Sequence, residues 1–311
     1  MKISAMLARA LFFAAALLLA PQPASARHGG GGSAGTHPAL FTVHGPKGTA
    51  YLFGSIHVLP SGINWKTPEI ARAMARADMF VFEIPLDHRE QDEQTAQRIQ
   101  KQIMDLHGLL PPGQSLRGML PDKMVSQYDG ALDMLSISPG YVDRLQPWLA
   151  SMVLENAQLY RSDVRAAEGV DLQVFAVATA LHKPSRGLET LEQQLALLTP
   201  EEQKSGMAEL GKMIAECTNM GVAHKIDAMV ASWARGDLKA VQTQTDSDFA
   251  KDPALKKTML DDRNARWIPQ IKAMLAENRT YFITVGAAHL VGPKGGPALL
   301  RAAGYTVDGP D

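Results

Sequence analysis

The sequence predicts an α/β fold whose sheet is built from strand units at the two ends of the chain, with a large helical insertion between them. Two observations carry this prediction. Short apolar and β-branched segments, typical of strands, occur within residues 39–85 and again within 280–307. Between them, apolar residues recur mostly at helical spacing. Because one sheet would then use both ends of the chain, we expect a single domain over residues 39–308.

The N-terminal unit begins with a hairpin and continues as strand, helix and strand. Residues 39–53 contain two strand-like segments on either side of the turn-like sequence Gly-Pro-Lys-Gly. Thr67 and Pro68 mark a helix start, because threonine caps helix N-termini and proline is favoured in the first turn. The helix over 70–77 leads to an apolar strand over 79–84. This unit predicts a parallel pair with a right-handed crossover.

The insertion is expected to be helical, with one short strand end inside it. Helical spacing is found over residues 89–107, 121–135, 147–160, 171–182 and 200–278. Beyond these helices we expect a strand end at 187–189, a strand at 280–285, a helix at 297–303 and a last strand at 305–307.

The N-terminus resembles a secretory signal peptide. Two basic residues precede an unbroken apolar run over 10–20, which is too short to span a bilayer comfortably. The sequence Ala-Ser-Ala then predicts cleavage after Ala26. Residues 1–26 are therefore expected to be a cleaved signal peptide, and the mature protein is expected in the periplasm or outside the cell. An uncleaved membrane anchor is the alternative. Residues 27–38 are rich in glycine and are expected to form a flexible leader.

The composition excludes several classes of protein. The 311 residues hold 31 Lys and Arg against 32 Asp and Glu, so the basic excess typical of a nucleic-acid-binding protein is lacking. An apolar content of 46% is too high for a disordered chain. The single cysteine, Cys217, excludes an internal disulfide and a cysteine-rich metal site. A metal site would have to use nitrogen and oxygen ligands.

Two segments share one pattern, in which an apolar strand stops at a glycine, two small or apolar residues follow, and then a histidine. They are Gly54-Ser55-Ile56-His57 and Gly286-Ala287-Ala288-His289. The glycine is expected to let the chain turn at the carboxyl end of a strand, where open α/β sheets place their ligands. Either segment alone is more typical of a turn with a hydrogen-bonded histidine. Together they predict that His57 and His289 meet at one site, and neutral imidazole binds Zn, Mn, Co and Fe ions.

Carboxylates and one Arg-Asn pair are expected at the same edge of the sheet. Glu83 ends the strand that follows the first histidine. Two histidines and one carboxylate form a workable ligand set for a hydrolytic metal, and Glu83 as the general base for a metal-bound water is the alternative. Glu189, at another predicted strand end, is expected to supply either role. Arg263 and Asn264 are expected to polarise a carbonyl or hold a carboxylate.

The ordered series of these residues resembles the TraB/GumN family, which includes the animal Tiki proteins. The resemblance spans residues 39–308. Besides the two glycine–histidine segments, it rests on Tyr51-Leu52-Phe53, Phe82-Glu83, Leu145-Gln146-Pro147-Trp148, Gly169-Val170-Asp171, Gly187-Leu188-Glu189-Thr190, Trp233 with Gly236-Asp237, Arg263-Asn264 with Trp267, Gly295-Gly296 and Gly304-Tyr305. Gln146 stands where the family frequently has lysine.

The resemblance implies a metal-dependent protease that uses Mn or Co, with His57, His289 and Glu83 in its active site. It implies further active-site roles for Glu189, Arg263 and Asn264. The wider superfamily is similar to erythromycin esterases and to haem-binding ChaN-like proteins. Bacterial members are often named for polysaccharide gene clusters, so the resemblance indicates the site more firmly than the substrate.

Three hypotheses follow for the function. The leading one is an exported, metal-dependent and protease-like hydrolase that holds Mn, Co or Zn and acts on a peptide or small-molecule substrate. The second is a non-catalytic periplasmic protein that binds haem or a metal. The third is an ester or glycan hydrolase linked to polysaccharide metabolism, or an interaction protein that keeps the fold without the activity. The carboxylates and the Arg-Asn pair favour water activation over haem ligation. We expect no nucleic-acid partner, and no membrane span after signal cleavage.

Overall fold

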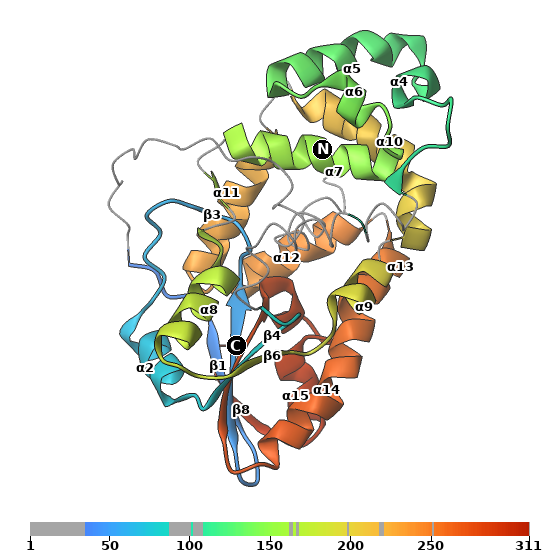
Figure 1. Cartoon of the computed structure of the whole chain (residues 1–311). Coiled ribbons are helices and arrows are strands. Elements are labelled where there is room, and N and C mark those ends of the chain that lie inside the picture. Colours follow the sequence, from blue (N-terminus) through green and yellow to red (C-terminus); the bar gives the residue numbers. More distant parts are fainter. Residues whose placement is uncertain are drawn as a thin grey trace.

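The chain folds around one mixed sheet of six strands in the order β6-β4-β7-β2-β1-β8 (Figure 1). The computed structural model describes residues 35–86, 101, 108–161, 164–165, 168–197, 199–217, 221–250 and 252–310. The six strands are β1 (Leu40–His44), β2 (Thr49–Ser55), β4 (Met79–Phe82), β6 (Ser185–Gly187), β7 (Thr280–Gly286) and β8 (Thr306–Asp308). A separate antiparallel pair joins β3 (Leu59–Pro60) to β5 (Val164–Arg165). The predicted mixture of strands and helices is confirmed.

Strand β7 occupies the middle of the parallel part of the sheet. It pairs in parallel with β2, where Ser55 lies opposite Gly286, and in parallel with β4 on its other side. The prediction that the two strands of the N-terminal unit pair directly is therefore wrong. All residues of β7 except the first are buried, and a strand that is apolar on both faces belongs in the centre of a sheet.

The edges of the sheet come from different parts of the chain. The predicted hairpin is confirmed as the antiparallel pair β1–β2, and β8 adds to β1 in antiparallel orientation. At the opposite edge, β6 pairs in parallel with β4. The sheet thus takes one strand from the middle of the chain, so its construction from the two ends alone is incomplete.

Helices fill most of the remaining chain. The helices that precede β7 in the sequence include α2 (Pro68–Arg76), α4 (Leu116–Met119), α5 (Asp122–Leu135), α6 (Pro139–Val142), α7 (Pro147–Arg161), α8 (Val170–Ala180), α9 (Leu191–Ala196), α10 (Thr199–Cys217), α11 (Gly221–Ala234), α12 (Leu238–Phe249) and α13 (Pro253–Lys256). A π-helical turn η5 (Lys257–Asp261) leads into α14 (Asp262–Leu275), and η6 (Ala287–Leu290, 3₁₀) and α15 (Gly296–Ala302) follow β7. Thr67 caps α2 as predicted, because its Oγ1 accepts from the backbone N–H of Ile70 at 3.3 Å.

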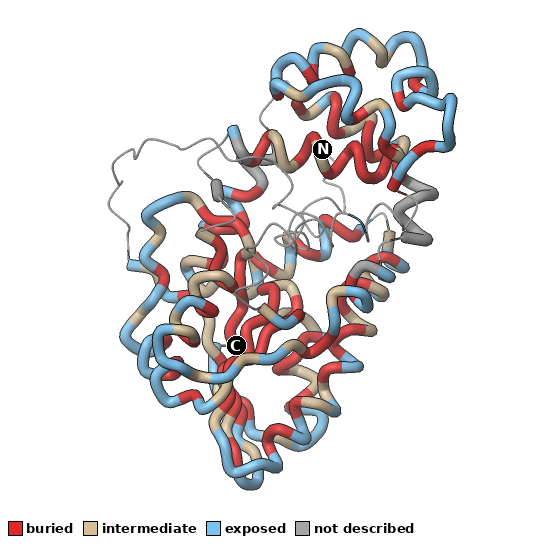
Figure 2. The backbone as a smooth tube through the Cα atoms, viewed as in Figure 1, coloured by how far each residue is buried: buried red, intermediate tan, exposed pale blue. Residues whose placement is uncertain are grey.

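The two faces of the sheet carry different helices. On one face, α2 and α8 pack against aromatic side chains that include Phe53 and Phe282. On the other, α14 and α15 cover an apolar cluster that includes Leu52 and Trp267. Buried residues accordingly run through the strands and through the inner sides of these helices (Figure 2).

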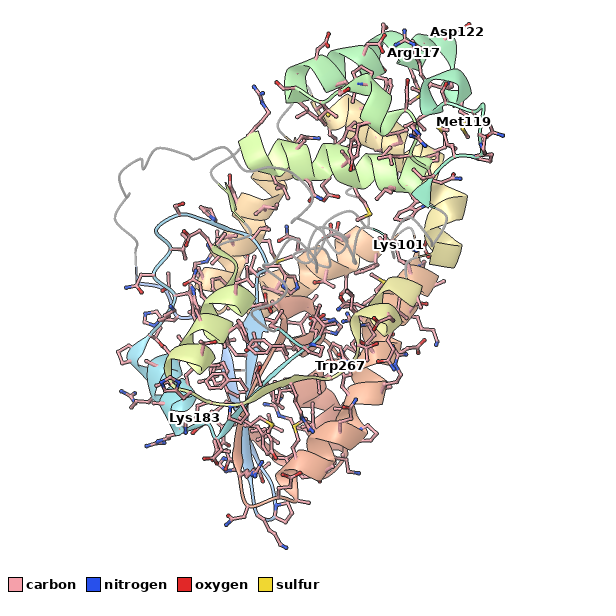
Figure 3. The ribbon with its side chains drawn as sticks, in the orientation of Figure 1. Lys101, Arg117, Met119, Asp122, Lys183 and Trp267 are labelled. Carbon is pink, nitrogen blue, oxygen red and sulfur yellow. The ribbon has the colours of Figure 1, made fainter. Side chains whose placement is uncertain are left out.

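Helices α4, α5, α6, α7 and α10 form a layer at the end of the molecule beyond the carboxyl ends of β2 and β7 (Figure 1). Arg117, Met119 and Asp122 project from its outer side, whereas Trp267 lies close to the sheet (Figure 3). The predicted helices at 121–135 and 147–160 are confirmed as α5 and α7 of this layer.

Some predictions concern residues that lie outside the described ranges. These are the signal peptide, most of the leader over 27–38 and nearly all of the helix at 89–107. Within the described ranges, no helix has the length and apolar character needed to cross a membrane.

Candidate functional site

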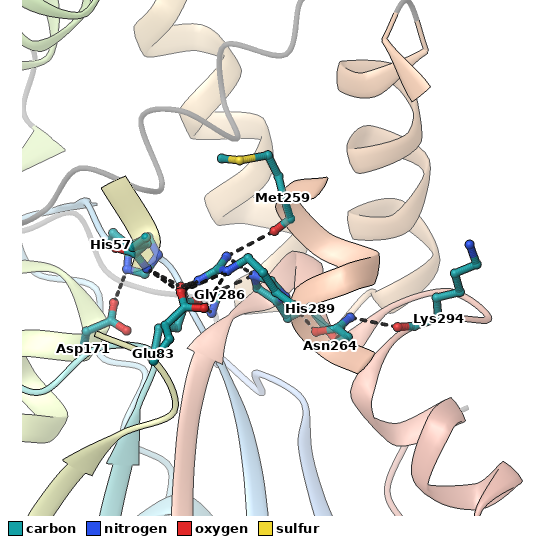
Figure 4. A network of polar contacts seen from close by, with 11 residues as sticks. His57, Glu83, Asp171, Met259, Asn264, Gly286, His289 and Lys294 are labelled. Atoms are coloured by element: carbon teal, nitrogen blue, oxygen red, sulfur yellow. Dashed lines mark hydrogen bonds and ion pairs between the residues drawn. The ribbon is translucent and has the colours of Figure 1, made fainter. Parts of the chain in front are cut away.

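The structure brings all six sequence-predicted site residues to one edge of the sheet. His57 and His289 follow β2 and β7, and Glu83 directly follows β4. Glu189 joins them because its backbone N–H donates to the Glu83 carbonyl oxygen at 2.9 Å. Arg263 and Asn264 reach the same edge from the first turn of α14. In Figure 4, His57 lies on one side of Glu83 and Gly286, and His289 and Asn264 lie on the other.

Arg263 is the centre of the cluster, and its side chain is fully buried. Its Nη2 donates to Glu83 Oε2 at 2.6 Å and also to Glu189 Oε1, while Nε donates to Glu189 Oε1 at 3.0 Å. Its Nη1 donates to the Met259 carbonyl of the π-helical turn at 3.1 Å. Burial lowers the pKa of Arg263, but the two carboxylates raise it by more. The guanidinium is therefore a permanent buried cation.

Glu83 is a buried carboxylate with a donor at each oxygen. Oε1 accepts from the backbone N–H of Gly286 at 2.7 Å, and Oε2 accepts from Arg263 and, at 3.3 Å, from Gln194 Nε2. Burial alone would raise the pKa of Glu83, but Arg263 and the Gly286 N–H hold it well below its usual range. Glu83 is thus ionised throughout the physiological range of pH.

His289 is held in one tautomer from both sides. Arg263 Nη1 lies 2.8 Å from its Nε2, and a guanidinium only donates, so Nε2 accepts. Nδ1 therefore carries the proton and donates to Asn264 Oδ1 at 2.8 Å. Burial and the neighbouring Arg263 charge lower the pKa of His289 to about 3. The ring also packs on Trp267, with centroids 4.5 Å apart, so His289 is a rigid and neutral imidazole.

His57 differs from His289, because its partner is a carboxylate. Nδ1 lies 2.5 Å from Asp171 Oδ2, which leaves Nε2 directed toward Gly286. Burial lowers the pKa of His57, but Asp171 and Glu83 together raise it by more, so the pKa lies above its usual value. The backbone places this pair, since the N–H of Val170 at the start of α8 donates to the Ile56 carbonyl at 2.9 Å.

Asp171 and Gln194 are the site residues that reasoning from strand ends did not identify. Asp171 lies in the first turn of α8, and Gln194 lies in α9, where its Nε2 donates to both Glu83 and Glu189. Neither residue follows a strand, so the search for polar residues at strand ends, which identified the two histidines, could not identify Asp171 or Gln194. The segment Gly169-Val170-Asp171 of the family resemblance was the available signal for Asp171.

The two motif glycines lie where neighbouring groups approach closely. Gly286 has φ −51°, which any residue adopts, so the prediction that it permits a special turn is wrong. A Cβ on Gly286 would lie 3.3 Å from Glu83 Oε1 and 3.6 Å from His57 Nε2. A Cβ on Gly54 would lie 3.1 Å from the Ala287 Cα of η6. The glycines therefore let β2, η6 and the site side chains approach one another.

The side chains suit a divalent ion in kind, but their arrangement does not fit one. Imidazole and carboxylate groups are common ligands of such ions. However, Arg263 occupies Nε2 of His289 and Oε2 of Glu83, and a cation beside it would be repelled. Within the part of the chain that the structure describes, no three His, Cys, Asp or Glu side chains are grouped to hold an ion.

The neutral state of His289 predicts a pH-dependent stability. Below about pH 6.5 the unfolded chain takes up a proton at His289 that the folded chain, with a pKa of about 3, does not. Between about pH 6.5 and pH 4.5 this lowers the free energy of unfolding by up to about 1.4 kcal/mol per pH unit. The raised pKa of His57 does not contribute, because its stabilisation is complete below pH 6.5 and is lost as the pH rises above that value.

The free energy of unfolding of the His289→Gln variant is expected to fall less than that of wild type as the pH is lowered from about 6.5 to about 4.5. Urea unfolding at several pH values in this range measures the difference. The exposed His182, which follows α8, supplies the control, and His182→Gln should keep the wild-type slope. Equal slopes for wild type and His289→Gln would contradict a neutral buried His289.

Comparison with known proteins agrees with the resemblance seen in the sequence. The TraB/PrgY/gumN family matches residues 39–309. An uncharacterised protein of Shigella flexneri, YbaP, is 25% identical over 253 residues, which cover 81% of this chain and 88% of the relative. YbaP of Escherichia coli (strain K12), also uncharacterised, is 27% identical over 193 residues, which cover 62% and 70% of the two chains. No solved structure matches the chain. Because the family match covers nearly all of the described sheet and helices, the chain belongs to the TraB/PrgY/gumN family.

Proposed function

We propose that this protein is a hydrolase that activates water at the carboxyl ends of β2, β4 and β7, with peptides as the first substrate class. The observation that carries the proposal is the pair His57–Asp171. An imidazole whose Nδ1 faces a carboxylate keeps its Nε2 lone pair directed at a reacting group, which is the arrangement of a general base.

The neighbouring groups support water activation. A Cβ built on Gly286 would lie 3.6 Å from His57 Nε2 and 3.3 Å from Glu83 Oε1, so both atoms face the same side of this glycine. A water bound between the two atoms donates one hydrogen bond to each and attacks the substrate carbonyl as Nε2 takes its proton. His57 then returns that proton to the leaving group. Because Glu83 stays ionised beside Arg263, it orients the water and leaves proton transfer to His57.

Arg263 and Asn264 serve this reaction as positioning residues. The Arg263 guanidinium already donates hydrogen bonds to two carboxylates, a carbonyl and an imidazole. The Asn264 amide is taken up by His289 and by the Lys294 carbonyl at 2.8 Å. Both therefore fix Glu83 and His289. Of the two roles expected for this pair, polarising a carbonyl or holding a carboxylate, Arg263 holds the carboxylates of Glu83 and Glu189.

A metal-dependent hydrolase with an ion held by His57, His289 and Glu83 is the second candidate. The two imidazole rings favour it because both face the same side of Gly286: a Cβ built there would lie 3.6 Å from His57 Nε2 and 3.7 Å from His289 Cδ2. A bound Mn, Co or Zn ion would supply an acidified water at neutral pH. This candidate requires Arg263 to leave His289.

One experiment tests the proposal and separates the candidates. The protein over residues 27–311 is assayed against peptide, ester and glycan panels, first in the presence of a chelator and then with Mn, Co or Zn. We expect hydrolysis of one class that persists with chelator and is lost in Glu83→Gln. Activity that appears only with metal supports the second candidate, and no hydrolysis of any class contradicts both.

Export is part of the same proposal. The signal-like residues 1–26 predict that the full-length protein expressed in a Gram-negative host reaches the periplasm and begins at Arg27. N-terminal sequencing of the protein from the periplasmic fraction measures this, and an intact Met1 in the cytoplasmic fraction would contradict it.

Gly286→Ala is expected to reduce hydrolysis with little effect on folding. Alanine adopts φ −51° freely, but its Cβ would project toward His57 Nε2 and Glu83 Oε1 and crowd the space beside them where the water is proposed to bind. We expect kcat/KM to fall about tenfold or more, because small displacements of reacting groups are costly. Gly130→Ala in α5, where a Cβ meets nothing within 4 Å, is the matched control. A Gly286→Ala enzyme with wild-type kcat/KM would exclude water binding in this space.

A further inference from the structure

One guanidinium satisfies three side chains of the site, and all three are of kinds that bind divalent ions in other proteins. Arg263 Nη1 contacts His289 Nε2 at 2.8 Å, and Nη2 contacts Glu83 Oε2 at 2.6 Å and also Glu189 Oε1. The three acceptors come from η6 after β7, from the residue after β4 and from the segment after β6, which lie far apart in the sequence. Two carboxylates and one imidazole are a familiar ligand set for divalent ions.

The charges show why a cation is required at this position. Glu83 and Glu189 are both buried and accept hydrogen bonds from the same Gln194 amide. Two ionised carboxylates so close together in a buried site require positive charge between them. Arg263 provides this charge, and its stacking over Trp267 at 4.7 Å and its hydrogen bond to the Met259 carbonyl hold it there.

The spacing of the acceptors matches the guanidinium. A divalent ion needs its ligand atoms about 2.0–2.2 Å from one point. Here the acceptors lie at hydrogen-bond distance from two different nitrogens of a planar cation. The same three side chains would have to close inward around a smaller ion, and the space for that movement exists only when the arginine side chain is absent.

We propose that Arg263 takes the place of a divalent ion at this edge of the sheet. The wild-type protein binds no ion through Glu83, Glu189 and His289, and removal of the guanidinium turns these three side chains into a metal site. The proposal concerns binding alone, so it stands or falls independently of which bond the protein hydrolyses.

Cobalt binding provides the test, by equilibrium dialysis and by the visible absorption of the bound ion. Arg263→Ala is expected to bind about one equivalent of Co²⁺ with at least about tenfold higher affinity than wild type. Arg263→Lys keeps a cation and is expected to behave like wild type. The double variant Arg263→Ala with Glu189→Gln loses one ligand and is expected to lose the binding.

Two results would overturn the proposal. One is a wild-type protein that holds about one equivalent of ion and loses it in His289→Ala. The other is an Arg263→Ala protein that folds but binds Co²⁺ no better than wild type. If Arg263→Ala folds only when Co²⁺ is added, the ion replaces the missing charge and the proposal is supported. If Arg263→Ala does not fold with or without Co²⁺, the wild-type and Arg263→Lys proteins test the proposal. Neither should bind Co²⁺ through Glu83, Glu189 and His289, and binding there by either protein would contradict it.

Discussion

Replacing Arg263 with alanine is expected to lower the free energy of unfolding by about 3–5 kcal/mol in the presence of a chelator. The loss arises because Glu83 and Glu189 keep their buried positions without the cation that offsets their charges. His289 Nε2 also loses its donor. Urea unfolding near neutral pH measures the effect, and chelator keeps any metal ion from replacing the arginine.

Arg266 provides the control for this expectation, because it lies on the same helix α14 but is exposed. Arg266→Ala should change stability by no more than about 0.5 kcal/mol. The Arg263→Ala deficit should also shrink as the pH falls, since Arg263 lowers the pKa of Glu83 and its removal lets Glu83 take up a proton at higher pH. A deficit as small as that of Arg266→Ala would mean that the carboxylates find another cation or take up protons at neutral pH.

The paired histidines were predictable because parallel strands end at the same edge of a sheet. The pattern at His57 and His289 is local, and the register that sets Ser55 opposite Gly286 then brings the two segments together across more than two hundred residues. The hairpin and the capped helix α2 were predictable for a related reason, because turn and cap residues act on their own neighbours.

The order of the strands in the sheet was harder to predict from the sequence. A strand–helix–strand unit favours direct pairing, and nothing within residues 49–85 indicates that β7 enters between its two strands. The burial of both faces of β7 decides that order, and it depends on helices α2, α8, α14 and α15 that the local pattern does not place.

The roles of the charged residues depend on burial, which the sequence pattern does not encode. Arg263 lies between Asp262 and Arg266 at the start of α14, and these charged neighbours give no sign of its burial. In the fold it is the largest charged side chain to be completely buried among the described residues. The expectation that it contacts substrate followed from its chemistry, whereas its two carboxylate partners fix it as a buried cation.

His57→Ala is expected to reduce kcat by about 10²–10⁴-fold on the substrate class identified by the panels, because general base catalysis contributes about that much. The wild-type kcat/KM should rise with pH through a step above pH 6.5, since His57 must lose its proton to act and its pKa is raised. A variant that keeps wild-type kcat would exclude His57 as the base.

Asp171→Asn separates proton chemistry from a purely structural role. Removing the Asp171 carboxylate takes away the interaction that raises the pKa of His57, so the step in kcat/KM should move to lower pH. Its height should also fall, because the amide no longer selects the tautomer with Nε2 unprotonated. Asp129→Asn in α5, far from the sheet, should change neither. If Asp171→Asn lowers activity equally at every pH, Asp171 only supports the fold; a shifted step identifies it as the residue that tunes and orients the base.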